Sequence, residues 1–542
     1  MPPHFTILGG GISGLSLAFF LRQRIHSTIA STTNLLPSPK VRQQIKDLLN
    51  ARITIIEGQE RVGGWINTND EHGHVFERGP RGFRPSGNGV EILRLAEDLG
   101  LANSAVKTSS ASKHRFLFVE GKLQQMPAGL SDLLQLPSVL RGAIKGVMNE
   151  PFQSKGLWSD ETIHSFITRR FGEHVANNIV GGMVSGIYGG DIKKLSIKSC
   201  FPKLWNIENE HGSILKGMLD PRIKILPNLD PFEGAIPTDS DFVHEYSKAA
   251  QVSFVHGLEQ LTATLEEQLL IEGSNVEIIR GDPATRLDIV NDNISSESRR
   301  SDQEGERRED EEDNDDGEFS GMKVALKSGH VLETDRVFST LPSEALSQIL
   351  CDSASNTALN ILDEMETCDI GLINMAFDDP ELIKRPAFGY LIPASEGEKV
   401  LGVSFDSCIF PDQTTSATAS QHNKNVNDKK RSTVVCVMVG GVNAPDVKEM
   451  SNAELLEEAK RAVTKHLNLK RTEVDHKLTK HIAGVVKGAI PQYRVGHSAS
   501  VQKLELLLKK EIPGLTILGT SFYGVGLADA VSRAKKVSVC CM

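Results

Sequence analysis

The chain has 542 residues, 39% of them hydrophobic; beyond the ~250–300 residues at which single cores stop growing, two or three domains are expected. Its net charge of −10 is local, because ten acids and two arginines between Glu304 and Glu318 contribute −8. The near-neutral remainder gives no indication of a nucleic-acid-binding surface. No apolar run reaches the ~18–20 residues of a membrane-spanning helix, and seven scattered cysteines without a C-x-x-C pair predict neither a disulfide framework nor a metal site.

The first predicted element is a nucleotide-binding turn. The apolar run Phe5–Leu8 has the composition of a buried parallel strand, and after the turn apolar residues recur at helical spacing. In such a unit glycines permit the tight turn, the approach of a pyrophosphate and close packing of helix on strand. The helix N-terminus adds unpaired N–H groups and partial positive charge. The residues expected to hold the nucleotide are Gly9, Gly10, Gly11, Ile12, Ser13 and Gly14.

The second strand, Ile53–Glu57, follows an insertion over residues 25–50. The Glu57 carboxylate is placed to accept hydrogen bonds from an adenosine ribose, although a solvated glutamate at a strand end is the alternative. An arginine and a glycine pair come next, as a flavin would need for a close backbone and a cation near its phosphates. This pattern resembles the second motif of the flavin amine oxidase and desaturase superfamily and makes FAD the expected cofactor. Its residues are Glu57, Gly58, Arg61, Gly63, Gly64 and Trp65.

A third glycine-rich segment, Phe76–Pro85, narrows the resemblance. It is similar to the F-E-x-G-P-R-G-x-R-P segment of the protoporphyrinogen oxidase family, and its glycines and proline leave the backbone bare. Arg81 is expected to face the polar edge or the pyrophosphate of the flavin; two solvated arginines around a Gly-Pro turn are the alternative. The cofactor-binding residues assigned here are Gly79, Pro80, Arg81 and Gly82.

Two later segments carry substrate roles that the resemblance implies. The strand His114–Val119 contains Arg115, which matches the family cation that pairs with a propionate of the tetrapyrrole; a surface arginine is the alternative. The run Gly181–Pro202 matches a family segment in which Gly186 lies near the substrate ring, although a glycine-rich helix break would have the same composition. Between them an apolar helix edged by Arg141 and Lys145 is equally typical of a membrane interface and of a core-facing helix.

The second half is predicted to form an antiparallel sheet over residues 386–441. Phe388, Leu391 and Met438 match family positions that sandwich the tetrapyrrole, whereas apolar strand residues are otherwise usually core. Ala284 matches a position that touches FAD. Residues 291–321, which are acidic, are expected to be a disordered loop, and residues 413–430 a second polar insertion.

The last segment returns the chain to the cofactor. A strand, a glycine turn and a helix start run from Leu515 to Asp529, after a family signature at Ile490–Tyr493. Such a helix N-terminus can direct positive potential at a flavin. The residues expected to contact FAD are Gly519, Val525, Gly526 and Leu527.

The expected fold is α/β plus α+β: a Rossmann-like FAD-binding domain, an antiparallel-sheet substrate domain and a helical, membrane-associated domain. The expected FAD-binding parts are residues 1–104, 250–345 and 484–542. The helical domain is expected over 105–249 and the substrate sheet over 346–483.

The resemblance implies an oxygen-dependent enzyme of the eukaryotic, mitochondrial, fungal type. The implied reaction is the six-electron oxidation of protoporphyrinogen IX to protoporphyrin IX, in haem biosynthesis, with three O2 reduced to three H2O2. Hydride passes from a meso carbon to flavin N5, and no protein residue is assigned as catalytic. The implied setting is a peripheral homodimer on the intermembrane-space side of the inner mitochondrial membrane, with a possible hand-off of product to ferrochelatase.

Three alternatives stay open. A flavin amine oxidase would need an aromatic cage, yet the chain has only five tyrosines and three tryptophans. A carotenoid desaturase-like enzyme is the second, and a non-catalytic flavoprotein that binds porphyrin is the third.

Overall fold

The computed structural model describes residues 2–32, 43, 46–71, 74–127, 142–220, 240–291, 319–414 and 432–540. The predicted insertions over 25–50, 291–321 and 413–430 fall wholly or partly outside these ranges. So does the first half of the apolar helix expected on either side of Arg141.

A parallel sheet with the strand order β19-β13-β1-β2-β9 organises the first part of the molecule. Its strands come from four distant stretches of chain, and the apolar β1 and β2 are buried on both faces, as parallel strands require. The strands are β1 (His4–Leu8), β2 (Arg52–Glu57), β9 (Val276–Arg280), β13 (Arg336–Ser339) and β19 (Leu515–Ile517).

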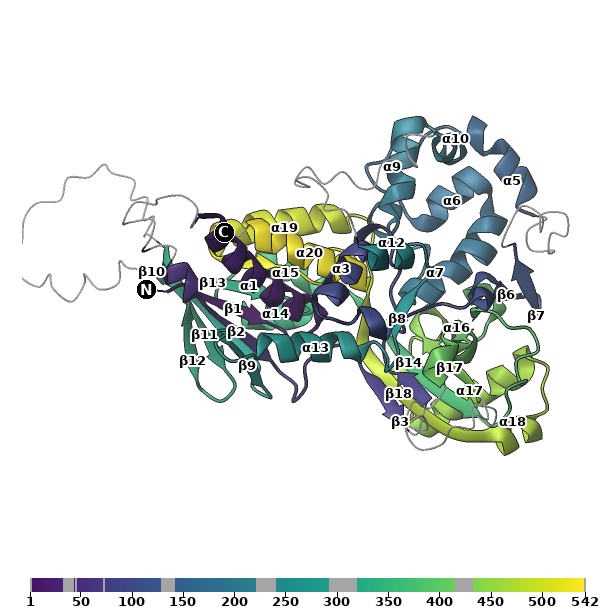
Figure 1. The fold of residues 1–542 in the computed structure, drawn as a ribbon. Coiled ribbons are helices and arrows are strands. Elements are labelled where there is room, and N and C mark those ends of the chain that lie inside the picture. The colour runs from purple at the N-terminus through teal and green to yellow at the C-terminus, as the bar shows by residue number, and fades with distance from the viewer. Residues whose placement is uncertain are drawn as a thin grey trace, which may run out of the picture.

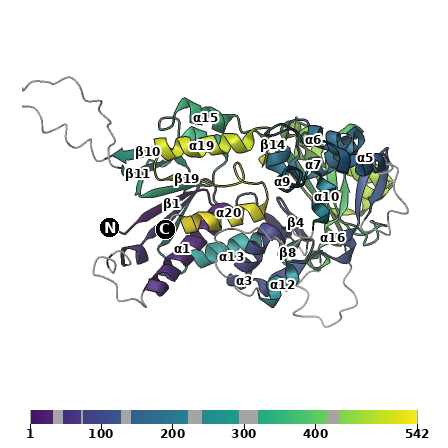
Figure 2. The ribbon, with the colours of Figure 1, turned by 90° about the horizontal axis from the view of Figure 1, so that it is seen from above.

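Two layers enclose this sheet. One contains α1, α3, α13 and α20, which share a core with the sheet; the other contains α14, α15, α19 and the antiparallel strands β10-β11-β12. Figure 2 shows α1, α13 and α20 on one side of β1 and α15 and α19 on the other. The bounds are α1 (Ile12–Thr32), α3 (Val90–Asp98), α13 (Glu259–Leu269), α14 (Ser343–Ile349), α15 (Asn356–Asp363), α19 (His497–Glu511), α20 (Leu527–Cys540), β10 (Ala284–Asn291), β11 (Phe319–Leu326) and β12 (Val331–Thr334).

A seven-stranded sheet with the order β18-β14-β17-β16-β15-β6-β7 forms the second part. Its pairs are antiparallel, as predicted, except that β15 and β6 run parallel. The stretch expected to be helical therefore gives two strands to this sheet before its first helix. One face packs on α17 (Asn452–His466). The strands are β6 (Arg115–Val119), β7 (Lys122–Met126), β14 (Thr367–Phe377), β15 (Gly389–Leu391), β16 (Val400–Ser404), β17 (Thr433–Gly440) and β18 (Leu478–Pro491).

A helical lobe, labelled by α5, α6, α9 and α10 in Figure 1, lies beside the seven-stranded sheet. Within the described ranges, no helix is both long and apolar enough to cross a membrane. The lobe comprises α5 (Ile144–Asn149), α6 (Ile163–Phe171), α7 (Gly181–Tyr188), α8 (Ile197–Cys200), α9 (Pro202–His211) and α10 (Ile214–Leu219). The remaining elements used below are β3 (Thr68–Glu71), β4 (His74–Glu77), β8 (Val252–Phe254) and α16 (Asp406–Ile409).

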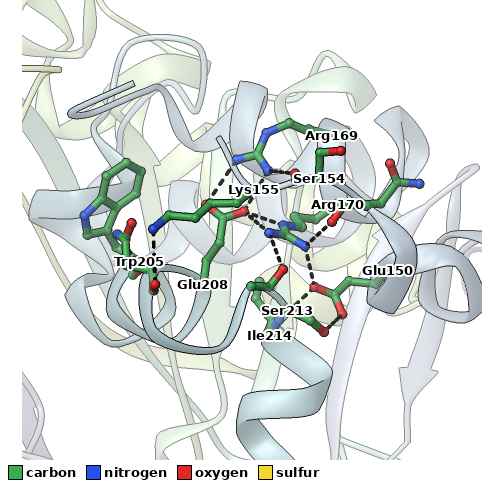
Figure 3. Close-up of polar contacts among 12 residues, drawn as sticks. Glu150, Ser154, Lys155, Arg169, Arg170, Trp205, Glu208, Ser213 and Ile214 are labelled. Carbon is green, nitrogen blue, oxygen red and sulfur yellow. Dashed lines mark hydrogen bonds and ion pairs between the residues drawn. The ribbon is translucent and has the colours of Figure 1, made fainter. Parts of the chain in front are cut away.

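Buried ion pairs hold the lobe together (Figure 3). The fully buried guanidinium of Arg170 contacts Glu150 and Glu208, which are also buried. Glu150 in turn accepts hydrogen bonds from Ser213 Oγ at 2.6 Å and from the backbone N–H of Ile214 at 2.8 Å, at the start of α10. Burial opposes the charge of Glu208, but hydrogen bonds from Arg169 and Arg170 outweigh it and lower the pKa of this carboxyl.

Candidate FAD and substrate site

The first glycine turn lies between β1 and α1, and Glu57 holds it against the end of β2. The Gly10 N–H donates to Glu57 Oε2 at 2.8 Å and the Gln59 N–H donates to Oε1 at 2.9 Å. A Cβ at Gly14 would lie 2.0 Å from the Gly9 carbonyl oxygen, so only glycine fits there. The carboxylate that was expected to bind a ribose therefore also fastens two loops together.

The second glycine turn touches the first. Gly63 donates its N–H to the Gly10 carbonyl at 2.8 Å, and Gly11 and Gly63 form a parallel bridge. Arg61 donates to the carbonyls of Val62, Gly64 and Ile66 at 2.7–3.0 Å. Arg61, which was predicted to be a cation near the phosphates, therefore stabilises its own turn by these hydrogen bonds.

The residue after β13 and the last motif lie at the same edge of the parallel sheet. Thr340, just after β13, donates through Oγ1 to the carbonyls of Leu8 and Gly9, and Gly519 faces the Thr340 carbonyl. Val525, Gly526 and Leu527 lie at the start of α20, which packs on α1. Gly58 packs on Pro283, the residue before Ala284, where β10 begins. The structure therefore brings the predicted cofactor residues of the first, second and last motifs to one end of the sheet.

The Gly79–Gly82 segment runs from this edge toward the seven-stranded sheet. A Cβ at Gly79 would lie 1.9 Å from the Trp65 carbonyl oxygen. Arg81 donates from Nε to both carboxylate oxygens of Asp406, at 3.0 and 3.1 Å. Burial disfavours the Arg81 charge, but Asp406 outweighs it and raises the pKa of the guanidinium. Its Nη2 is buried and has no partner among the described residues.

Glu77, at the end of β4, is a buried acid that we did not predict as a site residue. It accepts hydrogen bonds from the Leu258 N–H at 2.7 Å and from Thr68 Oγ1 at 2.8 Å. Burial raises the pKa of the Glu77 carboxyl to about 8. The sequence feature that could have identified Glu77 as a site residue is its position in the F-E-x-G-P-R-G segment.

The face of the seven-stranded sheet opposite α17 carries two rows of residues in register. The first row runs across five strands and consists of three large apolar side chains and two glycines, in the order Leu391, Gly402, Met438, Leu372 and Gly484. Two residues further along each strand, the second row is Gly389, Ser404, Cys436, Asn374 and Ile482. We refer to them as the apolar row and the polar row.

Leu391 and Met438, two predicted substrate residues, lie on the apolar row with Gly402 between them. Gly186, on α7, faces the same row, because a Cβ there would lie 2.4 Å from Leu391 Cδ2. Arg115 is exposed and lies over the ring of Phe388, 5.3 Å from its centroid. The structure therefore places Gly186, Leu391 and Met438 on one surface and makes Arg115 and Phe388 a contacting pair at its edge.

A cavity of about 450 Å³ separates the second glycine turn from the sheet. None of the five predicted substrate residues lines it, but Leu372, the neighbour of Met438 on the apolar row, does. Its lining includes three cations, Arg61, Arg78 and Lys487, and no carboxylate side chain. The lining residues are Gln59, Arg61, Gly64, Trp65, Asn67, Arg78, Leu372, Asn374, Ile482, Gly484, Val485, Val486 and Lys487. A larger cleft, about 560 Å³, lies around α17 between ion-paired surface residues and touches no glycine turn.

These features fit a bound flavin dinucleotide. Two glycine turns leave bare backbone where a pyrophosphate needs it, a helix N-terminus adjoins them, and a cationic cavity continues toward the sheet. Bound FAD would supply a two-electron acceptor. The chain would supply the glycine turns, the helix N-terminus and the cationic cavity that hold it.

The chain belongs to the flavin-containing amine oxidoreductase family, whose model matches residues 46–542. Within that family it resembles protoporphyrinogen oxidases, as predicted: it is 30% identical to the protoporphyrinogen oxidase of Homo sapiens over 548 residues, which are 98% of this chain and 97% of the relative. The coproporphyrinogen III oxidase of Bacillus subtilis is 23% identical over 98% of this chain and 96% of its own length. The protein is therefore an FAD-dependent oxidoreductase.

Among solved structures, a protein of Exiguobacterium sp. 255-15 assigned as a protoporphyrinogen oxidase superposes with a TM-score of 0.70 at 20% identity. The match covers 100% of this chain and 98% of that one. The two share the fold, which confirms the predicted combination of an FAD-binding and a substrate-binding part.

Proposed function

We propose that the enzyme oxidises protoporphyrinogen IX to protoporphyrin IX, removing six electrons and reducing three O2 to three H2O2. The observation that carries the proposal is the apolar row, which faces away from α17 and continues into the cavity beside the second glycine turn. A row of large apolar side chains and glycines offers an apolar surface suited to a macrocycle. The name of the human relative supports the same substrate.

In this proposal the chain orients the substrate and the bound flavin accepts the electrons. Arg115 pairs with a propionate at the edge of the sheet, while Phe388, Leu391 and Met438 contact the macrocycle. Gly186 leaves room against Leu391 for its approach. The predicted cofactor residues and domain boundaries are part of the same proposal.

The test is anaerobic mixing of the purified holoenzyme with protoporphyrinogen IX, coproporphyrinogen III, an amine or a carotene. We expect protoporphyrinogen IX to bleach the flavin band with the highest rate constant for flavin reduction. An enzyme that bleached only with the amine or the carotene would contradict the proposal, as would a protein that binds protoporphyrin IX but never bleaches. Preference for coproporphyrinogen III, which carries four propionates rather than two, would move the assignment to the activity named for the bacterial relative.

We further propose that the helical lobe rests on a membrane surface. Several large apolar side chains on it are exposed, which is unusual for a face that meets only water. The most exposed are Met148, Phe152, Leu157, Trp158 and Leu219, between 70% and 99% accessible. Together with the resemblance they support a peripheral position on the intermembrane-space side of the inner mitochondrial membrane.

Flotation with cardiolipin-containing vesicles tests this surface. Replacing Phe152, Leu157 and Trp158 by serine should abolish co-flotation without changing the flavin spectrum. Leu506→Ser, at a leucine on α19 that is 71% exposed, is the control outside the lobe and should float like the wild type. Equal flotation of all three proteins would contradict the proposal. A homodimer, and delivery of the product to ferrochelatase, complete the proposal; light scattering of the purified enzyme tests the first.

A further inference from the structure

Asn374 is a polar residue in the middle of an apolar strand. It lies on β14 between Ile373 and Met375, which point into the core that packs on α17. Because strand side chains alternate, Asn374 faces the opposite way, on the polar row. It lines the cavity between the second glycine turn and the sheet, two residues from Leu372 on the apolar row.

One end of the Asn374 amide is fixed by the fold. Its Nδ2 donates to the backbone carbonyl of Glu77 at 2.9 Å, across 297 residues of sequence. An amide turned the other way would set two oxygens against each other, so this bond leaves Oδ1 as the free acceptor of the amide.

The other end has no protein partner. Asn374 is 1% exposed, and its Oδ1 is buried without a hydrogen bond to any described residue. A buried acceptor left unsatisfied is costly, and native proteins rarely retain one unless a ligand or water completes it. Asn374 lines the cavity, so a ligand held there would lie next to this side chain.

We propose that Asn374 Oδ1 accepts a hydrogen bond from a ring N–H of a bound heterocycle, and that this bond positions the heterocycle against the sheet. Two ligands carry that chemistry here: the flavin ring, and the pyrrole rings of the tetrapyrrole. An amide suits this task because it accepts a hydrogen bond without competing for the proton. A bond to the flavin requires only the FAD cofactor that the family implies, whereas a bond to the tetrapyrrole rests on the proposed function.

The test compares Asn374→Leu with Asn443→Leu in the purified holoenzyme. Asn443 is the matched control, since its Nδ2 also donates to a backbone carbonyl, that of Val400 at 3.0 Å, its Oδ1 also lacks a described partner, and it does not line the cavity. Three quantities are measured: the dissociation constant of FAD from the apoprotein, the flavin midpoint potential, and the dissociation constant of protoporphyrin IX together with KM for protoporphyrinogen IX.

A flavin source predicts that Asn374→Leu weakens FAD binding about tenfold or shifts the potential by about 30 mV, the two-electron equivalent of a tenfold change. A tetrapyrrole source predicts unchanged flavin values and about a tenfold rise in the porphyrin constants. In both cases Asn443→Leu stays within twofold of the wild type. For Asn374→Leu, dissociation constants and a KM within twofold of the control, together with an unchanged midpoint potential, would overturn the proposal.

A second variant and the flavin measurements decide the two cases in which this comparison would fail. If Asn374→Leu does not fold, Asn374→Ser removes the same Oδ1 with a smaller change in polarity, and the same measurements decide. If the wild-type enzyme does not oxidise protoporphyrinogen IX, the proposed function fails, while the FAD constant and the potential still test Asn374 against the flavin.

Discussion

Arg81 Nε donates hydrogen bonds to both carboxylate oxygens of Asp406, to Oδ1 at 3.0 Å and to Oδ2 at 3.1 Å. The pair joins the glycine segment after β4 to the first residue of α16, beyond β16, and both side chains are at most 15% exposed. It therefore couples the cofactor-binding part to the substrate sheet.

Breaking this pair from one side should destabilise the fold. Within the described part of the chain, Arg81→Met leaves the buried Asp406 carboxylate with Ser404 Oγ as its remaining side-chain donor, and we expect a loss of about 3–5 kcal/mol in the free energy of unfolding. Urea denaturation measures it. The double variant Arg81→Met/Asp406→Leu should recover part of the loss; a double variant as unstable as the sum of both single changes would contradict this account.

Glu77 should make stability depend on pH. Burial raises the pKa of its carboxyl from 4.5 to about 8, so the folded state holds this proton where the unfolded chain has released it. The protonated Glu77 carboxyl contributes fully to the free energy of unfolding below about pH 4.5, and this contribution is lost as the pH rises through 8. We expect the free energy of unfolding of the wild type to fall over that interval relative to Glu77→Gln. Parallel curves for the two proteins would show that Glu77 does not titrate this way.

The first glycine turn separates cofactor binding from folding. A Cβ at Gly11 would meet only Gly64, at an ordinary 3.8 Å, whereas a Cβ at Gly14 would lie 2.0 Å from a backbone oxygen. Gly11→Ala should therefore keep the unfolding midpoint of the wild-type apoprotein but weaken FAD binding at least tenfold, since the methyl group stands where the pyrophosphate approaches. Gly14→Ala should lower stability by about 1–3 kcal/mol or more. Tight FAD binding by Gly11→Ala would reject the turn as the pyrophosphate site.

Arg115 should act on the substrate and not on the flavin. Arg115→Ala should lower kcat/KM for protoporphyrinogen IX about tenfold, the order expected for a charged hydrogen bond, with an unchanged FAD spectrum. Arg385→Ala is the matched control, because Arg385 is also exposed and lies over an aromatic ring, Phe116, at 4.8 Å. Equal kinetics for the two variants would remove Arg115 from the substrate site.

The buried ion pairs of the helical lobe should be far more sensitive than those on the surface. Arg170→Met leaves Glu150 and Glu208 without their shared cation, and we expect a loss of about 3–5 kcal/mol. Arg52→Met, which breaks an exposed pair with Glu277, should cost less than about 1 kcal/mol. Thermal unfolding of both variants checks the difference; similar midpoints would argue that the lobe does not depend on this network.

The sequence by itself determined the nucleotide-binding turn, the FAD cofactor and the enzyme family. The turn follows from short-range geometry, since a Cβ at Gly14 would lie 2.0 Å from the Gly9 carbonyl oxygen. The cofactor and the family follow from motifs that resemble those of known flavoproteins. Substrate positions such as Leu391 and Met438 came only from resemblance, since an apolar strand residue looks the same whether it faces the core or a ligand.

Only the tertiary structure decided which residues of distant segments meet. The apolar row depends on the register of five strands, and one residue of slip would turn every side chain to the other face. Arg81, expected to be a cation for the cofactor, is engaged by Asp406, a partner 325 residues away that no local pattern identifies. Asn374 meets Glu77 across 297 residues, and its unsatisfied oxygen exists only because the sheet and the glycine segment pack together.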